Sequence, residues 1–278
     1  MRLLLGTLVL TLAATLGVAS PSGADGFPVP LPTSPDGDPV GANDWSCQPT
    51  EKRPEPVIIV HGTFGDRKHL LDDLSSAMVD AGFCVFSLDY GNRGTADIAS
   101  SARVLRSFTE KVLSRTGADK VSMVGHSQGG MMPRYYIKFL GGASVVDDLV
   151  GLSPSNHGTV IVGDPSNPLT GPAVDLLCRA CNQQAAGSTF LRRLNAGDET
   201  PGRVSYTQIS TRYDEVVVPY SSAFLAAGPR TTNLTVQDRC PLDLAEHVLI
   251  PMSRTAIAVT LDALTHDGPA RPTYHPAC

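Results

Sequence analysis

Ser127 lies in a short motif whose residue types and spacing suit covalent catalysis. Residues 125–129 have the sequence Gly-His-Ser-Gln-Gly, and they join an apolar run at 121–124 to a helical stretch at 131–140. A sharp turn between a strand and a helix exposes the serine hydroxyl at the top of a sheet, and glycines are needed where strand and helix pass closest. The motif therefore predicts a nucleophile elbow.

A serine hydroxyl is a weak nucleophile, so other residues must supply a base and an acid. The base has to lie within hydrogen-bond reach of the hydroxyl, and the acid fixes the tautomer of the base and stabilises its charge. In chains with this elbow the acid follows a late strand, and the histidine comes last. Asp214 follows a predicted strand at 204–209, and His247 follows the last predicted strand. We predict Ser127, Asp214 and His247 as nucleophile, acid and base.

Other residues compete for the roles of acid and base. Glu215 is the nearest alternative acid, but adjacent side chains point in different directions, and an aspartate at the strand exit suits a short reach to imidazole. His266 and His275 also follow Asp214, yet the first ends a predicted helix and the second lies in a proline-rich tail. Three further histidines are expected to flank the site without supplying the base: His61, His126 and His157.

Two residues are predicted to stabilise the oxyanion that forms when Ser127 attacks a carbonyl group. The N–H of Gln128 starts the helix after the elbow, where the helix dipole is positive. Thr63 follows the predicted strand at 57–60, and it offers both a main-chain N–H and a hydroxyl. Losing one such donor typically costs on the order of 3 kcal/mol of transition-state stabilisation.

Strand and helix patterns alternate along the chain and must bring these residues together. Apolar runs predict strands at 57–60, 83–88, 121–124, 149–152, 204–209 and 231–236, with helical patterns at 68–81, 95–115, 131–140 and 248–264. This alternation predicts an α/β fold with a mostly parallel, doubly wound sheet and helices on both faces. The pattern lapses at about 159–202, where we expect a small cap or lid insertion.

The N-terminal sequence and the composition indicate an exported protein. An apolar run at 3–18 is too short to span a membrane, and small residues follow it at 22–24. We therefore expect a secretory signal peptide at 1–24, an irregular arm at 25–56 and an extracellular catalytic domain at 57–278.

The formal net charge of −5 comes without a basic stripe, which argues against a nucleic-acid partner. We expect a monomer with no membrane span, no cofactor and no metal.

Six cysteines in an exported chain predict three disulfides, although the sequence alone allows 15 pairings. Cys178 and Cys181 are close enough in sequence to form a local staple, and a zinc or redox motif is disfavoured because no second cysteine pair or nearby histidine accompanies them. The other four lie near the first two predicted strands or in the C-terminal part of the chain: Cys47, Cys84, Cys240 and Cys278. Bridges between Cys47 and Cys84 and between Cys240 and Cys278 would fit those positions.

Several stretches in a fixed order extend the pattern beyond the elbow. They are residues 60–65 (Val-His-Gly-Thr-Phe-Gly), 125–130, 155–159 (Ser-Asn-His-Gly-Thr), 187–191 (Gly-Ser-Thr-Phe-Leu), 213–216 (Tyr-Asp-Glu-Val), Cys240-Pro241 and Glu246-His247. Together they resemble the class 2 secreted bacterial triacylglycerol lipases and, more distantly, the fungal lipase B group. Residues 160–185 match no lid sequence of that family.

The resemblance implies an α/β-hydrolase fold and a set of site residues. It implies Ser127, Asp214 and His247 as the triad, and Thr63 with Gln128 as the oxyanion hole. It also supports the disulfides that join residues 47 and 84 and residues 240 and 278.

The predicted function is hydrolysis of the carboxylic esters of acylglycerols by a secreted esterase or lipase, through an acyl-enzyme on Ser127. The substrate would be a lipid or another ester, met in solution or at an oil–water interface. A short-chain carboxylesterase, a polyesterase and an acyltransferase remain alternatives, because the shape of the cleft decides the substrate. A non-catalytic binding protein of the same fold would have no use for all of these residues.

Overall fold

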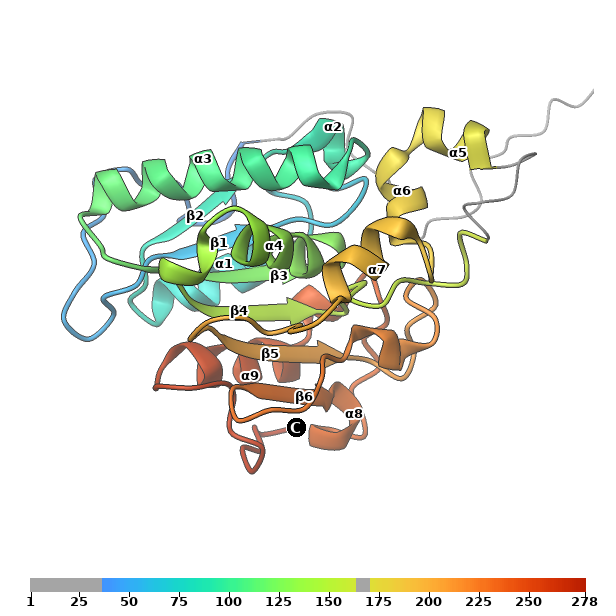
Figure 1. The fold of residues 1–278 in the computed structure, drawn as a ribbon. Helices are drawn as coiled ribbons and strands as arrows, with labels where there is room; N and C mark the ends of the chain where they lie inside the picture. The colour runs from blue at the N-terminus through green and yellow to red at the C-terminus, as the bar shows by residue number, and fades with distance from the viewer. Residues whose placement is uncertain (1–36, 164–170) are drawn as a thin grey trace, which may run out of the picture. The chain divides into compact units, whose positions relative to one another are not determined.

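Six parallel strands form one sheet in the order β2-β1-β3-β4-β5-β6 in this computed structural model, which describes residues 37–163 and 171–278 (Figure 1). The described residues belong to one compact unit, Pro32–Cys278. The strands are β1 (Val57–Val60), β2 (Val85–Leu88), β3 (Val121–His126), β4 (Val146–Leu152), β5 (Ser205–Ser210) and β6 (Thr231–Thr235). The prediction of an α/β fold with a parallel sheet is confirmed.

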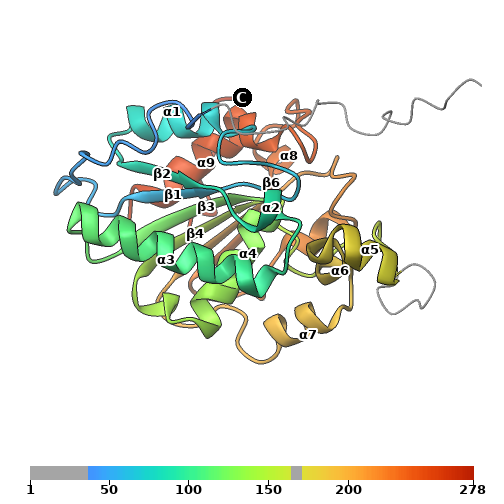
Figure 2. The same ribbon diagram turned by 90° about the horizontal axis from the view of Figure 1, so that it is seen from above.

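Helices cover both faces of the sheet, as predicted. Figure 2 shows α1 and α9 on one face and α3 and α4 on the other. The helices are α1 (Asp72–Asp80), α2 (Gly91–Gly94), α3 (Ile98–Thr116), α4 (Gln128–Phe139), α5 (Gly171–Leu177), α6 (Arg179–Gln184), α7 (Thr189–Asn195), α8 (Val236–Arg239) and α9 (Arg254–Leu264). Short 3₁₀ turns occur at Gly142–Ser144, Tyr220–Ala223 and Ile250–Met252.

The strands supply a hydrophobic core on each side of the sheet. Successive side chains of β1 alternate between them: Val57 and Ile59 pack with residues of α1 and α9, whereas Ile58 and Val60 pack with residues of α3 and α4. All four are fully buried. Burying such a side chain stabilises the fold by roughly 1.5–3 kcal/mol relative to leaving it exposed. A continuous apolar run is therefore the expected signature of a strand covered on both faces.

The first long helix begins four residues later than the helical pattern at 68–81 predicts. The carboxylate of Asp66 accepts the main-chain N–H groups of Lys68 and His69, which holds these residues in a turn. Leu70 then has a φ angle of 61°, which is incompatible with a right-handed helix. Helix α1 therefore starts only at Asp72.

Local capping also moves the start of two other helices. Asp97 accepts the N–H of Ser100, so α3 starts at Ile98 and not at 95. The closing helix, predicted over 248–264, is preceded by the 3₁₀ turn that contains Pro251, and it begins after Ser253 caps it. Proline lacks an N–H and cannot continue the hydrogen-bond pattern of a helix interior. Among the strands, β2 starts two residues later than expected and β4 starts three residues earlier.

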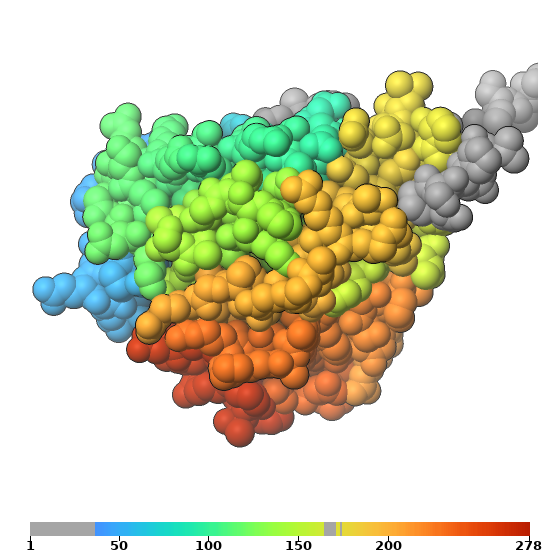
Figure 3. All heavy atoms as spheres, viewed as in Figure 1, coloured from blue at the N-terminus to red at the C-terminus, as the bar shows by residue number. Residues whose placement is uncertain are grey.

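Three short helices, α5, α6 and α7, lie between β4 and β5, where a cap or lid insertion is expected. In the space-filling view the side chains of α6 and α7 lie directly against those of α3 and α4 (Figure 3). Residues 164–170 of this insertion lie outside the described residues, as do the predicted signal peptide and the first part of the predicted arm. The described part of the arm packs along β2, where the N–H of Asn43 donates to the carbonyl oxygen of Val85 at 2.9 Å.

The six cysteines form three disulfides. The bonds join Cys47 to Cys84, Cys178 to Cys181, and Cys240 to Cys278, with Cα–Cα distances of 5.8, 5.3 and 5.1 Å. The first ties the arm to the residue before β2, the second lies in the insertion, and the third joins the end of α8 to residue 278. None of these cysteines is therefore free to act as a thiol nucleophile or a metal ligand.

Candidate active site

Ser127 lies at the turn between β3 and α4 in a backbone conformation that few residues adopt. Its φ and ψ angles are 55° and −124°. The turn is tight enough to require glycine on both sides: a Cβ atom on Gly125 would lie 1.9 Å from the carbonyl oxygen of Gly129, and one on Gly129 would lie 2.2 Å from that of Val60. Strain of this kind persists only where the surrounding structure imposes it, as it does at many functional sites.

The ring of His247 lies between the Ser127 hydroxyl and a carboxylate. Nε2 of His247 is 3.0 Å from Oγ of Ser127, and Nδ1 is 2.9 Å from Oδ1 of Asp214. Asp214 comes from the loop after β5, and His247 from the segment between α8 and α9. All three segments meet at the edge where the parallel strands end, and all three side chains are buried. The residues selected from sequence order are thus in direct contact.

Asp214 is held as an ionised acceptor. Its Oδ1 accepts the main-chain N–H groups of Val216 and Val217, at 3.1 and 2.7 Å. Burial by itself would raise the pKa of Asp214, but the interaction with His247 and the Val217 N–H outweigh it, so the pKa lies below its ordinary value. A carboxylate at Nδ1 keeps the proton of a neutral imidazole on that nitrogen, which leaves Nε2 free to accept a proton from Ser127.

The other histidines contact different groups. His266 pairs with Asp262 on α9, and His157 pairs with Glu199 at 2.9 Å. His61 is stacked on Tyr90, with ring centroids 4.2 Å apart, and its Nδ1 donates to the carbonyl oxygen of Gly62. Burial lowers the pKa of His61 to about 4, so the ring is neutral near pH 7. His126 makes a direct contact with His247, which its expected place at the edge of the site did not predict.

The residues proposed as oxyanion donors are linked through their side chains. The hydroxyl of Thr63, in the loop after β1, donates to Oε1 of Gln128 at 2.8 Å. Nε2 of Gln184 donates both to this hydroxyl, at 3.0 Å, and to the same Oε1, at 2.8 Å. The Thr63 hydroxyl must therefore turn away from Gln128 before it donates to a substrate, because a hydroxyl carries one proton.

Gln184 is a site residue that the sequence analysis missed. It comes from α6 in the insertion, and its Oε1 accepts a hydrogen bond from Ser155 at 2.7 Å. The side chain thus connects the insertion to the loop after β4 and to the elbow. Only its position three residues before the Gly187 stretch could have indicated a role, and a glutamine in a helix is more often a surface residue.

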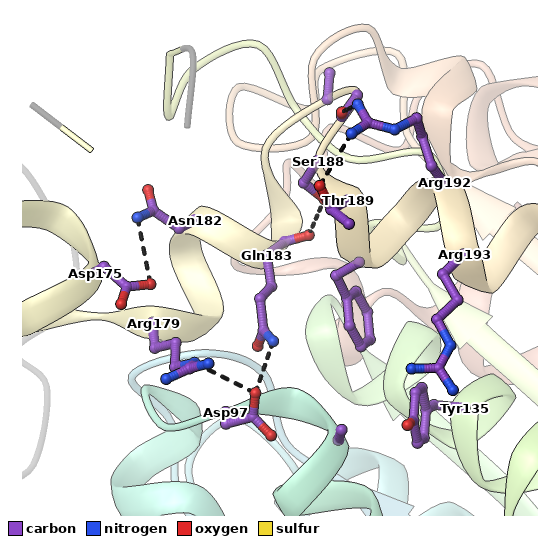
Figure 4. Close-up of a pocket in the computed structure, with 14 residues that line it drawn as sticks. Asp97, Tyr135, Asp175, Arg179, Asn182, Gln183, Ser188, Thr189, Arg192 and Arg193 are labelled. Atoms are coloured by element: carbon purple, nitrogen blue, oxygen red, sulfur yellow. Dashed lines mark hydrogen bonds and ion pairs between the residues drawn. The ribbon is translucent and has the colours of Figure 1, made fainter. Parts of the chain in front are cut away.

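A hollow of about 590 Å³ lies beside the insertion, between α6 and α7 on one side and α3 and α4 on the other. Asp97 at the start of α3 accepts a hydrogen bond from Gln183 at 2.8 Å and pairs with Arg179 at 3.4 Å (Figure 4). On the other side Arg193 and Tyr135 line the wall. The Asp97 contacts fasten the insertion helix that carries Gln184 to the body of the fold.

Most of the exposed large apolar side chains in the described residues lie in segments that follow strands. They come from the loop after β4, from α5, from the loop after β5 and from the segment after α8: Val160, Ile161, Leu176, Leu177, Tyr213, Leu242, Leu244 and Leu249. Ser127, Asp214 and His247 also come from segments that follow β3, β5 and β6 along the chain. Exposed apolar side chains of this kind can contact apolar partners.

The described residues contain no group of three or more histidine, cysteine, aspartate or glutamate side chains arranged to hold a metal ion. Within the same residues, no helix combines the length and the apolar character needed to cross a membrane.

Comparison with solved structures identifies the class of fold. Lipase B from Aspergillus fumigatus superposes with a TM-score of 0.69 at 24% identity, covering 85% of this chain and 57% of that chain. The mature lipase BlEst2 from Bacillus licheniformis superposes with a TM-score of 0.61 at 18% identity, covering 79% of this chain and 95% of that one. The fold is the α/β-hydrolase fold.

Sequence comparison then gives the family. Residues 54–255 match the family described as lipase (class 2), and the chain belongs to that family. A triacylglycerol lipase from Pseudarthrobacter phenanthrenivorans is 35% identical over 92 residues, which are 29% of this chain and 27% of that relative. The match thus spans about a quarter of the relative's length.

Proposed function

We propose that this protein hydrolyses carboxylic esters through a covalent acyl-enzyme on Ser127. The observation that carries the proposal is the continuous contact from the Ser127 hydroxyl through His247 to Asp214, at 3.0 and 2.9 Å. Membership of the lipase (class 2) family supports the same reaction.

In the first half of the reaction, Nε2 of His247 takes the proton of the Ser127 hydroxyl while Oγ attacks the ester carbonyl carbon. The carbonyl oxygen becomes an oxyanion that accepts hydrogen bonds from the N–H of Gln128 and from Thr63. The tetrahedral intermediate then breaks its bond to the alcohol oxygen. His247 returns its proton to that oxygen, so the alcohol leaves and Ser127 keeps the acyl group.

In the second half, a water molecule takes the place of the alcohol. His247 removes a proton from the water, the resulting hydroxide adds to the acyl carbon, and the second intermediate releases Ser127 Oγ as it regains the proton. The product is a carboxylic acid. Asp214 keeps its negative charge throughout and stabilises the imidazolium form of His247.

The substrates proposed are acylglycerols. The exposed apolar side chains in the segments after β4, β5 and α8 would suit acyl chains, and the triacylglycerol lipase relative is a guide to the class of ester. We further propose that residues 57–278 form the catalytic domain with a cap at about 159–202, that residues 1–24 direct export, and that the protein is extracellular and monomeric. Three disulfides support an oxidising compartment.

The proposal is tested by combining labelling with a substrate series. An organophosphonate should label Ser127 in the wild-type protein, and Ser127→Ala should lose both labelling and ester hydrolysis. Ser205→Ala is a matched control, because Ser205 is also buried but starts β5 at the opposite edge of the sheet.

The substrate class is tested with p-nitrophenyl esters of increasing chain length and with emulsified triglyceride. Activity on long-chain esters and emulsified triglyceride is expected. Hydrolysis of short soluble esters alone would instead define a carboxylesterase, and unchanged turnover in Ser127→Ala would refute the assignment of the nucleophile.

A further inference from the structure

His126, the residue before the nucleophile, makes a hydrogen bond that reaches the proposed base. Its Nε2 lies 2.8 Å from the main-chain carbonyl oxygen of His247, and the two ring centroids are 5.0 Å apart. A carbonyl oxygen only accepts hydrogen bonds, so Nε2 of His126 must carry the proton and donate it. The contact therefore fixes one tautomer of His126.

The His126 ring is neutral as well as fixed. Burial lowers its pKa to about 3, and the charge of the nearby His247 acts in the same direction, whereas the hydrogen bond to the His247 carbonyl oxygen raises the pKa. Asp214 favours the protonated form of His126, and His69 disfavours it. A neutral ring supplies the hydrogen bond without placing a second full positive charge beside the imidazolium that forms on His247.

Several other contacts of the His247 segment come from other parts of the fold. Thr211 donates to the carbonyl oxygen of Ala245 at 2.6 Å, Gln237 donates to that of Asp243 at 3.0 Å, and the N–H of His247 lies 3.4 Å from a Glu215 oxygen. Only the His126 bond, among these, joins the backbone of His247 to the strand that carries Ser127. It therefore ties the base and the nucleophile to one rigid element.

We propose that His126 is a positioning residue, which fixes the backbone of His247 so that its Nε2 stays in line with the Ser127 hydroxyl during both proton transfers. This inference rests on the proposed function. Reacting groups held about 1 Å from their productive geometry lose about 100-fold in rate. The bond acts on the geometry of the base and makes no contact with substrate, so it affects kcat and not KM.

Three substitutions separate the hydrogen bond from the volume of the ring. His126→Phe keeps the ring and removes the donor. His126→Gln places an amide N–H at about the position of Nε2, whereas the shorter His126→Asn does not reach the carbonyl oxygen. The control is His266→Phe, which alters a partly buried histidine two residues after the end of α9, where it pairs with Asp262.

We expect His126→Phe and His126→Asn to lower kcat by roughly 10- to 100-fold with KM unchanged. The same factor should appear in the rate at which an organophosphonate labels Ser127. His126→Gln should recover most of the loss, and His266→Phe should match the wild type. Wild-type kcat in both His126→Phe and His126→Asn would overturn the proposal, as would an equal loss in all three His126 variants.

A spectroscopic measurement tests the same bond without turnover. Two-bond ¹H–¹⁵N correlation spectra of the wild-type protein should show His126 protonated on Nε2, and the downfield proton of the His247–Asp214 contact should broaden in His126→Phe but stay sharp in His126→Gln. Protonation on Nδ1 of His126 would refute the inference. If the wild type hydrolyses no ester and Ser127 resists labelling, the proposed function fails, while these spectra still decide whether His126 positions His247.

Discussion

Asp214 and Glu215 are adjacent in sequence, yet their carboxylates reach different atoms of His247. Oδ1 of Asp214 lies 2.9 Å from the ring nitrogen Nδ1, whereas the Glu215 carboxylate lies 3.4 Å from the main-chain N–H. One carboxylate thus contacts the imidazole ring and the other contacts the backbone. The geometry therefore favours Asp214 over Glu215 as the acid, because only the Asp214 carboxylate contacts the ring nitrogen.

Asp214→Asn is expected to lower kcat by about 10⁴-fold, because an amide that donates to Nδ1 stabilises the wrong tautomer of His247. Glu215→Gln should change kcat by less than about 10-fold, since its oxygen still accepts from the backbone. Steady-state kinetics on one p-nitrophenyl ester compares the two variants directly. The opposite order would move the role of the acid to Glu215.

Thr63→Val is expected to lower kcat by roughly 10- to 1000-fold with little change in KM, because the hydroxyl would donate to an oxyanion that exists only after attack. Thr63→Ser keeps the hydroxyl and should retain most of the activity. If Thr63→Val has wild-type kcat, the hydroxyl keeps its hydrogen bond to Gln128, and of the Thr63 groups only the main-chain N–H donates to the oxyanion. A change confined to KM would make Thr63 a binding contact.

The stability contributed by His61 and His126 should fall as the pH is lowered from 6.5 to about 4. His61 and His126 have pKa values lowered to about 4 and about 3, so in this range the unfolded chain binds protons that the folded chain does not. Each such group contributes a slope of about 1.4 kcal/mol per pH unit. Asp214, whose pKa is also lowered, adds to the loss at still lower pH, as the pH falls through its folded pKa.

Urea unfolding at several pH values between 7 and 4 measures this dependence. His126→Gln carries no titrating ring and should have a slope shallower by about one histidine's contribution, or about 1.4 kcal/mol per pH unit. Equal slopes for the variant and the wild type would show that His126 takes up its proton over the same pH range in the folded and unfolded states, and so would contradict a lowered pKa.

Removing the bond between Cys47 and Cys84 should cost more than removing the bond between Cys178 and Cys181. The sequence separations are 37 and 3 residues, and the chain-entropy relation assigns them about 4 and about 2 kcal/mol. Double serine variants should therefore differ in Tm by several degrees, at about 2–4 °C for each kcal/mol. A larger loss from the shorter loop would mean that native contacts in the insertion outweigh chain entropy.

Much of the fold was predictable because its signals are local. The apolar runs of β1 and β3 are buried on both faces, so they stand out without knowledge of their neighbours. The start of α1 was not predictable, because the helical pattern continues through Lys68 and His69. In the structure the Asp66 side chain accepts the N–H groups of these two residues instead. Helix periodicity does not reveal such competition.

Some residues of the candidate site were likewise predictable from the sequence, and others were not. Ser127, Asp214 and His247 were named from chain order, and they lie in contact. The contacts of Gln184 and His126 depend on how an irregular insertion and a distant loop pack against the elbow. Neither Gln184 nor His126 belongs to a sequence pattern in its own segment that would have predicted these contacts. The positions of such residues follow from tertiary packing alone.

The hydroxyl of Ser127 and the ring of His247 are 3.0 Å apart in space but 120 residues apart along the chain. Contacts between such distant positions form late, because a long loop must close before they stabilise anything. During refolding with the disulfides intact, helical circular dichroism should therefore recover before esterase activity. The proposed site forms only when segments far apart in the chain have packed together, so the appearance of activity measures the time at which the last of these segments docks.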